Sequence, residues 1–161
     1  MTSRTAAGRG SATSSGLMIR PTDLEAIRRH GEDGYPNECC GLLLGRVEST
    51  GGVRVKAVTS VERLENERDD SRHNRFLITP ATFLSADRAA RLRGVEILGF
   101  YHSHPDAPAV PSEFDREHAW PFYSYVIVSV DNGDARELNS WVLAEDRTHY
   151  NAEPVVPARE D

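Results

Sequence analysis

The sequence predicts an α/β fold, with a single mixed β-sheet flanked by helices. Three observations lead to this prediction. The chain has 161 residues, of which 39% are hydrophobic, which is typical of one globular domain. Segments with the two-residue period of strands alternate with segments that have the helical period. The segment VEILGFYHSH is mostly apolar, as in a central strand that is covered on both faces.

The N-terminal residues MTSRTAAGRGSATSSG are small and polar, so we expect residues 1–16 to form a flexible tail. They lack the apolar segment of a secretory signal, and a mitochondrial transit peptide is the second interpretation. The apolar run LMIR follows and ends at Pro21. The segment TDLEAIRRHGEDGYP then predicts an amphipathic helix that opens with a capping box of Thr22 and Glu25.

The middle of the chain predicts a hairpin, a strand and a helix. ECCGLLLGRVE and VRVKAVTSVERL flank Gly51 and Gly52, which favours a β-hairpin. The polar loop NERDDSRHN leads to an expected strand, RFLIT. PATFLSADRAARLRG is expected to be a helix, with Pro80 in its first turn and Gly94 after its end.

The last third predicts a short helix and two or three further strands. SEFDREHAW reads as a helix opened by Ser112, and SYVIVSV and ELNSWVLAE as strands joined by the turn DNGDA. THYNAEPVVPARED can add an edge strand. We expect one domain over residues 17–156 and a C-terminal tail over residues 157–161.

Composition and charge exclude several classes of function. A net charge of -6 and a pI near 5.5 disfavour nucleic acid as a partner. No apolar run approaches the roughly 18 residues that span a bilayer, so we expect no membrane partner. Cys39 and Cys40 are adjacent, where a disulfide would be strained, so we expect a reducing, cytoplasmic location and buried thiols.

The segment GFYHSHPDAPAVPSEFD carries the strongest chemical signal. His102 and His104 are two residues apart in a strand, so their rings point to the same side. Asp115, at the start of the following helix, can supply a third ligand. Three protein ligands and one open position are typical of a catalytic zinc site. Zinc lowers the pKa of water in that position to about 7.

Hydrolysis also needs a general acid/base. Glu38 is the candidate, because a carboxylate at the mouth of the apolar strand CCGLLLG is costly unless it is used or paired.

Taken together, these residues resemble the signature of the JAMM, or MPN-plus, zinc metallopeptidases. That signature is an upstream Glu, then His-x-His, seven residues, Ser, two residues and Asp, and every position matches here. The resemblance implies an MPN/JAMM fold of the cytidine-deaminase-like type. It also implies one zinc ion per protomer on His102, His104 and Asp115, with Glu38 as general acid/base and Ser112 as a hydrogen-bond partner of the water or oxyanion.

The resemblance implies a substrate as well. The family cleaves bonds after the C-terminal Gly-Gly of ubiquitin-like proteins, and its bacterial members act on sulfur-carrier proteins. We therefore predict a carrier of this kind, with its tail extended along a cleft strand. A deubiquitinase-like isopeptidase is less favoured, since only a short loop separates His104 from Ser112.

Other interpretations stay open at this stage. Ser112 and Asp115 also fit a plain capping box, and the chain as a whole could be a non-catalytic MPN-type scaffold or a zinc carrier. Trp120 and Trp141 read as core residues, and His118 lies one turn after Asp115 without an assigned role. The sequence leaves open the identity of the substrate, the length of the released segment and the oligomeric state.

Overall fold

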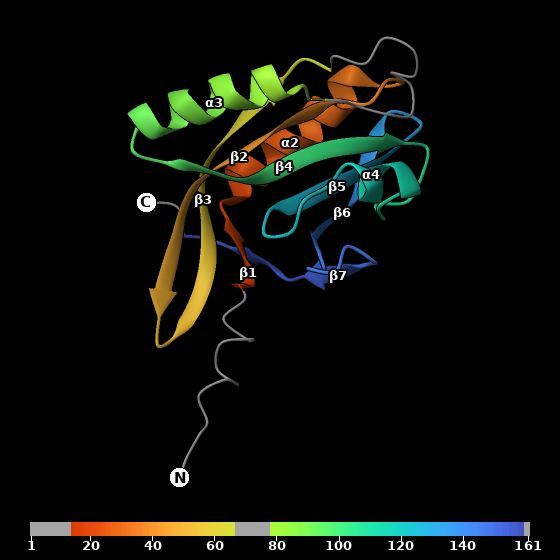
Figure 1. Cartoon of the computed structure of the whole chain (residues 1–161). Helices are drawn as coiled ribbons and strands as arrows, with labels where there is room; N and C mark the ends of the chain where they lie inside the picture. The colour runs from red at the N-terminus through yellow and green to blue at the C-terminus, as the bar shows by residue number, and fades with distance from the viewer. Residues whose placement is uncertain (1–13, 67–77, 160–161) are drawn as a thin grey trace.

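The computed structural model describes residues 14–66 and 78–159, which form a mixed α/β domain (Figure 1). The elements are β1 (Ser14–Ile19), α2 (Pro21–Gly34), β2 (Cys40–Thr50), β3 (Val53–Leu64), α3 (Pro80–Leu92), β4 (Glu96–Pro105), α4 (Glu113–Glu117), β5 (Ser124–Asp131), β6 (Asp134–Leu143), β7 (Tyr150–Glu153) and β8 (Val155–Pro157). The predicted class, a single mixed sheet flanked by helices, is confirmed.

The strands form one sheet in the order β7-β6-β5-β4-β2-β3-β1-β8. β2 is antiparallel to β3 and β4, whereas β4 is parallel to β5 and β1 is parallel to both β3 and β8. Only Pro154 separates β7 from β8 in the sequence, yet these two strands lie at the two opposite ends of the strand order. The sheet must therefore curl until its edges approach each other, and the Leu17 N–H donates to the Pro154 carbonyl at 2.9 Å.

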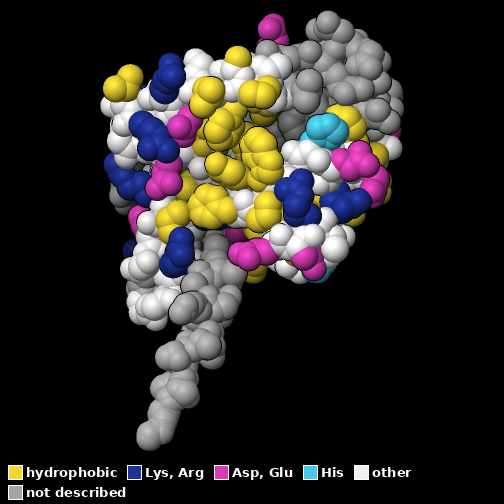
Figure 2. Space-filling model, in the orientation of Figure 1, with side chains coloured by type: hydrophobic (Ala, Val, Ile, Leu, Met, Phe, Trp, Pro, Cys, Tyr) yellow, Lys and Arg dark blue, Asp and Glu magenta, His cyan; other side chains and the backbone are white. Residues whose placement is uncertain are grey.

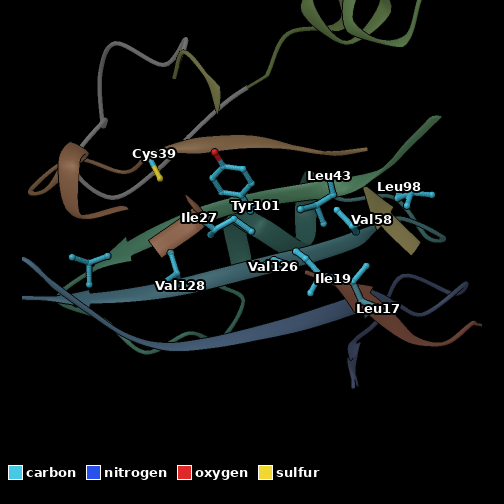
Figure 3. Packing of buried hydrophobic residues seen from close by; sticks show 11 residues of the cluster. Leu17, Ile19, Ile27, Cys39, Leu43, Val58, Leu98, Tyr101, Val126 and Val128 are labelled. Carbon is cyan, nitrogen blue, oxygen red and sulfur yellow. The ribbon is translucent and has the colours of Figure 1, made fainter. Parts of the chain in front are cut away.

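The two faces of the sheet carry separate hydrophobic clusters. One cluster packs Ile27 of α2 against the sheet (Figure 3), and its sheet residues include Leu17, Leu43, Tyr101 and Val126. The other includes Ala90 of α3 together with Leu42, Leu44, Ile97, Phe100, Tyr125 and Leu143. Helices α2 and α3 thus cover opposite faces of the sheet. The cluster to which a strand residue belongs therefore tells which of the two helices its side chain faces.

The predicted turns and two of the predicted helix starts are confirmed. Gly51 and Gly52 have φ values of 60° and 81°, as a two-residue hairpin of type I′ requires. The Ser112 hydroxyl accepts from the backbone N–H of Asp115, and Ser112 is the N-cap of α4. Helix α3 begins with Pro80 in its first turn, as predicted.

The predicted capping box of Thr22 and Glu25 is wrong. Pro21 is the first residue of α2, and Arg20 is the N-cap, with extended backbone at φ −72° and ψ 146°. A residue that precedes proline is disfavoured in the helical region, so the cap falls two residues before Thr22. The Arg20 side chain instead forms an ion pair with Asp23 at 2.8 Å.

The expected RFLIT strand lies mostly outside the described residues, which exclude residues 67–77. Its last two residues, Ile78 and Thr79, are not in a strand, and Thr79 is the N-cap of α3, where its hydroxyl accepts from the N–H of Thr82. Because Thr79 caps α3, it belongs to the start of this helix and not to the expected strand.

The two ends of the domain also differ from the sequence-based boundaries. β1 begins at Ser14, within the expected tail, while residues 1–13 lie outside the described part of the chain. The expected edge strand is β7, and the chain then continues into β8, which pairs with β1. Within the described residues, we find no helix of the length and apolar character needed to cross a membrane.

Candidate metal centre

Strand β4 presents both histidines on the face that α3 covers. Phe100 belongs to the cluster on that face and Tyr101 to the cluster on the opposite face, so the alternation of the strand carries His102 and His104 to the side of Phe100. Their Nε2 atoms lie 3.1 Å apart. Both side chains are buried, with relative exposures of 1% and 7%.

Asp115, in the first turn of α4, completes the cluster. Its Oδ1 lies 3.3 Å from Nε2 of His102, and its Oδ2 lies 3.2 Å from Nε2 of His104. The ligand atoms of all three residues lie within 4.8 Å of one another. Two imidazole nitrogens and one carboxylate therefore converge on one point, as a divalent metal ion requires.

The ligands are held by contacts with the backbone. Nδ1 of His104 lies 2.8 Å from the carbonyl of Pro108; since a carbonyl only accepts, Nδ1 carries the hydrogen and Nε2 presents its lone pair to the cluster. The N–H of Ser112 donates to Oδ2 of Asp115 at 2.8 Å, and the N–H of Asp115 donates to the Ser112 hydroxyl at 3.1 Å. The capping box thus orients the third ligand.

The loop between the second histidine and Ser112 is braced by side chains from β5 and β6. The Ser129 hydroxyl donates to the Ala107 carbonyl at 2.7 Å. The carbonyl of Ala109 accepts from Nδ2 of Asn139 at 3.2 Å and from Nε1 of Trp141 at 3.1 Å. The sequence analysis missed this role of Trp141; its only sequence signal is the spacing of two from Asn139, which places both side chains on one face of a strand.

The charges of the three residues suit metal binding. Burial alone would raise the pKa of Asp115, but its contacts with the imidazoles of His102 and His104 and with the N–H of Ser112 hold that pKa well below its usual range. Burial lowers the pKa of His102. A carboxylate that stays ionised and a buried imidazole that stays neutral are the forms that bind metal.

This donor set fits zinc. Zn²⁺ is bound by imidazole nitrogen and carboxylate oxygen, whereas Ca²⁺ and Mg²⁺ prefer sites made of oxygen. His102, His104 and Asp115 supply three donors, and a tetrahedral zinc ion held by three donors would have one position left for a reactant.

Glu38 comes to the same face through the pairing of β2 with β4. Cys40 is the partner of His102 in this antiparallel pair, and the N–H of Ser103 donates to the Cys39 carbonyl at 3.1 Å. β2 begins at Cys40, so Glu38 lies two residues before the paired part of the strand; if the same register continued, it would fall opposite His104 and on its side of the sheet. Glu38 is buried, with a relative exposure of 6%.

The two cysteines are free and buried, on opposite sides of the sheet as expected. Cys39 belongs to the cluster under α2, and burial raises the pKa of its thiol to about 11. The sulfur of Cys40 lies 4.0 Å and 3.8 Å from the carbonyls of Leu64 and Glu65. Neither thiol belongs to the three-residue cluster.

Fold and site together define an α/β domain with a cluster of three candidate metal ligands at the end of a central strand. The comparisons with known proteins identify it further. The family model of prokaryotic homologues of the JAB domain matches residues 22–144. The chain belongs to this family, and the resemblance to JAMM peptidases drawn from the motif is confirmed.

Three relatives match a large part of the chain. It is 34% identical to the desampylase of Haloferax volcanii over 124 residues. The matched region covers 74% of this chain and 84% of that protein. The chain is 35% identical over 108 residues to the probable TtuB-protein conjugate cleaving protease of Thermus thermophilus, covering 67% and 66%. It is 28% identical over 130 residues to the CysO-cysteine peptidase of Mycobacterium tuberculosis, covering 80% and 84%.

Solved structures share the fold. A protein from Desulfitobacterium hafniense, known in solution, superposes with a TM-score of 0.74 at 31% identity and covers 89% of this chain and 94% of that one. A protein from Salinibacter ruber gives a TM-score of 0.67 at 41% identity, covering 88% and 91%.

Proposed function

We propose that this protein is a zinc-dependent metallopeptidase that hydrolyses a peptide or isopeptide bond after the C-terminal Gly-Gly of a ubiquitin-like sulfur-carrier protein. One observation carries the proposal: the ligand atoms of His102, His104 and Asp115 converge within 4.8 Å of one another. The buried Glu38, two residues before β2, supports it as the candidate acid/base. The names of the three relatives support hydrolysis of protein conjugates as the reaction class. A cytoplasmic location agrees with two free cysteines.

In this proposal His102, His104 and Asp115 hold one zinc ion. When bound, zinc acts as a Lewis acid that polarises the scissile carbonyl and acidifies water. Glu38 accepts the proton of the attacking water and delivers it to the leaving amine. Its place just before Cys40, the register partner of His102, suits this shuttle, and the side chain is shielded from bulk solvent.

Ser112 has a second task in this scheme. Its Oγ accepts the N–H of Asp115 in the capping box, and this bond leaves its own hydroxyl hydrogen able to donate. Because Ser112 is exposed beside the ligands, we assign that hydrogen to the negative oxygen that forms as the carbonyl is attacked.

The route of the substrate follows from the pairing of β4. β4 is bonded to β2 on one side and to β5 on the other, so it has no free edge for the tail. The tail predicted along a cleft strand must therefore cross the end of β4 on its histidine side. Close approach of a backbone to the metal leaves little space for a Cβ, which accounts for glycines before the scissile bond.

The test is a cleavage assay with defined tails. A sulfur-carrier protein extended by one amino acid after Gly-Gly, and the same protein ending in Gly-Ala before that residue, are incubated with the enzyme, and release is followed by mass spectrometry. We expect the first to be cleaved and the second to be left intact. Equal cleavage of both, or rapid cleavage of an unstructured casein-like chain, would show a general peptidase and contradict the proposal.

A further inference from the structure

An apolar pocket of about 340 Å³ opens directly beside the metal ligands. It lies between α3 and α4, where hydrophobic side chains gather on the face shown in Figure 2. Its lining includes Phe83, Phe100, Trp120 and Tyr125, together with the proposed ligands His102 and Asp115. Only His102 and Asp115 among these are used by the chemistry proposed above.

Five of the eleven residues that line the pocket are Phe, Tyr or Trp. Phe100 and Tyr125 stack at 5.6 Å between centroids, and Phe83 meets Trp120 edge to face at 6.1 Å. Trp120 is 51% exposed. A large aromatic side chain left half in water at the rim of a pocket is typical of a binding surface.

The polar groups of the pocket give a side chain few partners. The hydroxyl of Tyr125 accepts from the N–H of Trp120 at 2.9 Å and keeps one hydrogen to donate, and Nδ1 of His118 lies 2.9 Å from the Phe114 carbonyl. A polar side chain placed in the pocket would exchange its hydration for these few groups in a lining that is mostly apolar. An acidic one would also meet the carboxylates of Asp115 and Glu117.

We propose that this pocket binds a large apolar side chain of the residue that is released, the one directly after Gly-Gly. The inference rests on the proposed function. Since His102 and Asp115 belong to both pocket and metal site, the occupant must lie next to the scissile bond. The glycines have no side chain, and the residue before them is about 7 Å further along an extended chain. The residue after the bond is therefore the nearest that can fill the pocket.

The size of the preference can be stated. A hydrophobic pocket discriminates by about 10- to 200-fold in kcat/KM between substrates whose apolar side chains differ slightly in size. We expect a carrier extended by Phe or Leu to be cleaved at least about tenfold more efficiently than one extended by Ser or Asp.

The experiment measures kcat/KM for four carriers that differ only in the residue after Gly-Gly: Phe, Leu, Ser or Asp. A fifth carrier ends in Phe but has the residue before Gly-Gly changed to Ala. The enzymes are the wild type, Trp120→Ala, Trp120→Phe and the control Leu84→Ala, which removes an exposed apolar side chain of α3 outside the pocket. Zinc content is measured for each.

We expect Trp120→Ala to keep its zinc and to reduce the Phe-to-Ser ratio of kcat/KM to near one, while Trp120→Phe restores much of it and Leu84→Ala matches the wild type. Equal cleavage of all four extensions overturns the pocket assignment and leaves the proposed function standing. A strong dependence on the residue before Gly-Gly, without dependence on the one after it, also overturns it. Failure to cleave any carrier contradicts the proposed function itself.

Discussion

Two of the proposed metal ligands, His104 and Asp115, are oriented by contacts with the backbone, and Glu38 is the residue whose proposed role depends most on the fold around it. The pattern of the sequence predicted its place at the mouth of an apolar strand. It could not predict the register that sets Cys40 opposite His102, because strand pairing joins residues far apart in the chain.

Replacing Glu38 by Gln tests its role as proton shuttle. The amide keeps the shape of the side chain but cannot accept the proton, so we expect turnover of a Gly-Gly carrier to fall by about 10²- to 10⁴-fold, with unchanged zinc content and unfolding temperature. Glu62→Gln, an exposed glutamate of β3, serves as the control. Turnover of the Glu38 variant near that of the wild type would remove this residue from the mechanism.

His30 of α2 predicts a pH dependence of stability. Burial, helped by Arg63 and opposed by Asp33, lowers the pKa of His30 from 6.5 to about 4, and its Nδ1 lies 2.7 Å from the Tyr101 hydroxyl. Below pH 6.5, His30 therefore binds a proton in the unfolded chain, whereas in the folded chain it binds this proton only near pH 4. Stability that is present above pH 6.5 is lost as the pH falls through this window.

The variant His30→Gln keeps a partner for Tyr101 but does not titrate. In metal-free protein we expect the wild type to lose roughly 1 to 2 kcal/mol more than the variant between these pH values, after allowance for the half-exposed ring. Urea unfolding at each pH measures this difference. Parallel curves for the two proteins would contradict the account.

At the scale of elements, the loop from Pro105 to Pro111 connects two of the ligands and is braced by β6. We expect Trp141→Phe, which removes the N–H that reaches Ala109, to speed zinc loss to a chelator by about tenfold, since outer contacts of metal ligands typically change affinity by 10- to 100-fold. Trp120→Phe is the matched control. Equal rates of zinc loss for the two variants would show that the Trp141 bond does not support the site.

Local sequence patterns predicted the secondary-structure elements better than they predicted which elements pack or pair with each other. The turn at Gly51-Gly52 and the cap at Ser112 follow from residues that lie within a few positions, and both were predictable. The pairing of β1 with β8 could not be predicted, because it depends on contacts between the two ends of the domain. The role of Trp141 was missed for the same reason, since its partner lies in another element.

At the scale of the whole molecule, a buried ionic network closes the curled sheet. Lys56 of β3 bonds to the Phe122 carbonyl and, at 2.9 Å, to the Ser124 hydroxyl. Glu153 of β7 accepts from the hydroxyls of Ser124 and Ser140, each at 2.7 Å, and lies 4.0 Å from the Lys56 ammonium. β3 and β5 are not neighbours in the sheet, so these bonds join strands across its interior.

Lys56→Met should therefore destabilise the fold as a whole. Removing one partner of a buried ion pair costs about 3 to 5 kcal/mol, and the two serines that still bond to Glu153 favour the lower end. Denaturant unfolding measures the loss, with Arg54→Met, an exposed residue on the same strand, as control. A difference between the two variants below about 1 kcal/mol would contradict a structural role for the network.

The central claim is that one zinc ion on His102, His104 and Asp115 makes this protein a peptidase. The most direct test is to titrate metal-free protein with zinc and to measure the turnover of a Gly-Gly carrier at each addition. The account predicts that turnover in the wild type and in His118→Ala rises linearly to one equivalent and then stays constant, and that His104→Ala stays inactive throughout. Full turnover without zinc, or an unchanged titration curve in His104→Ala, would contradict it.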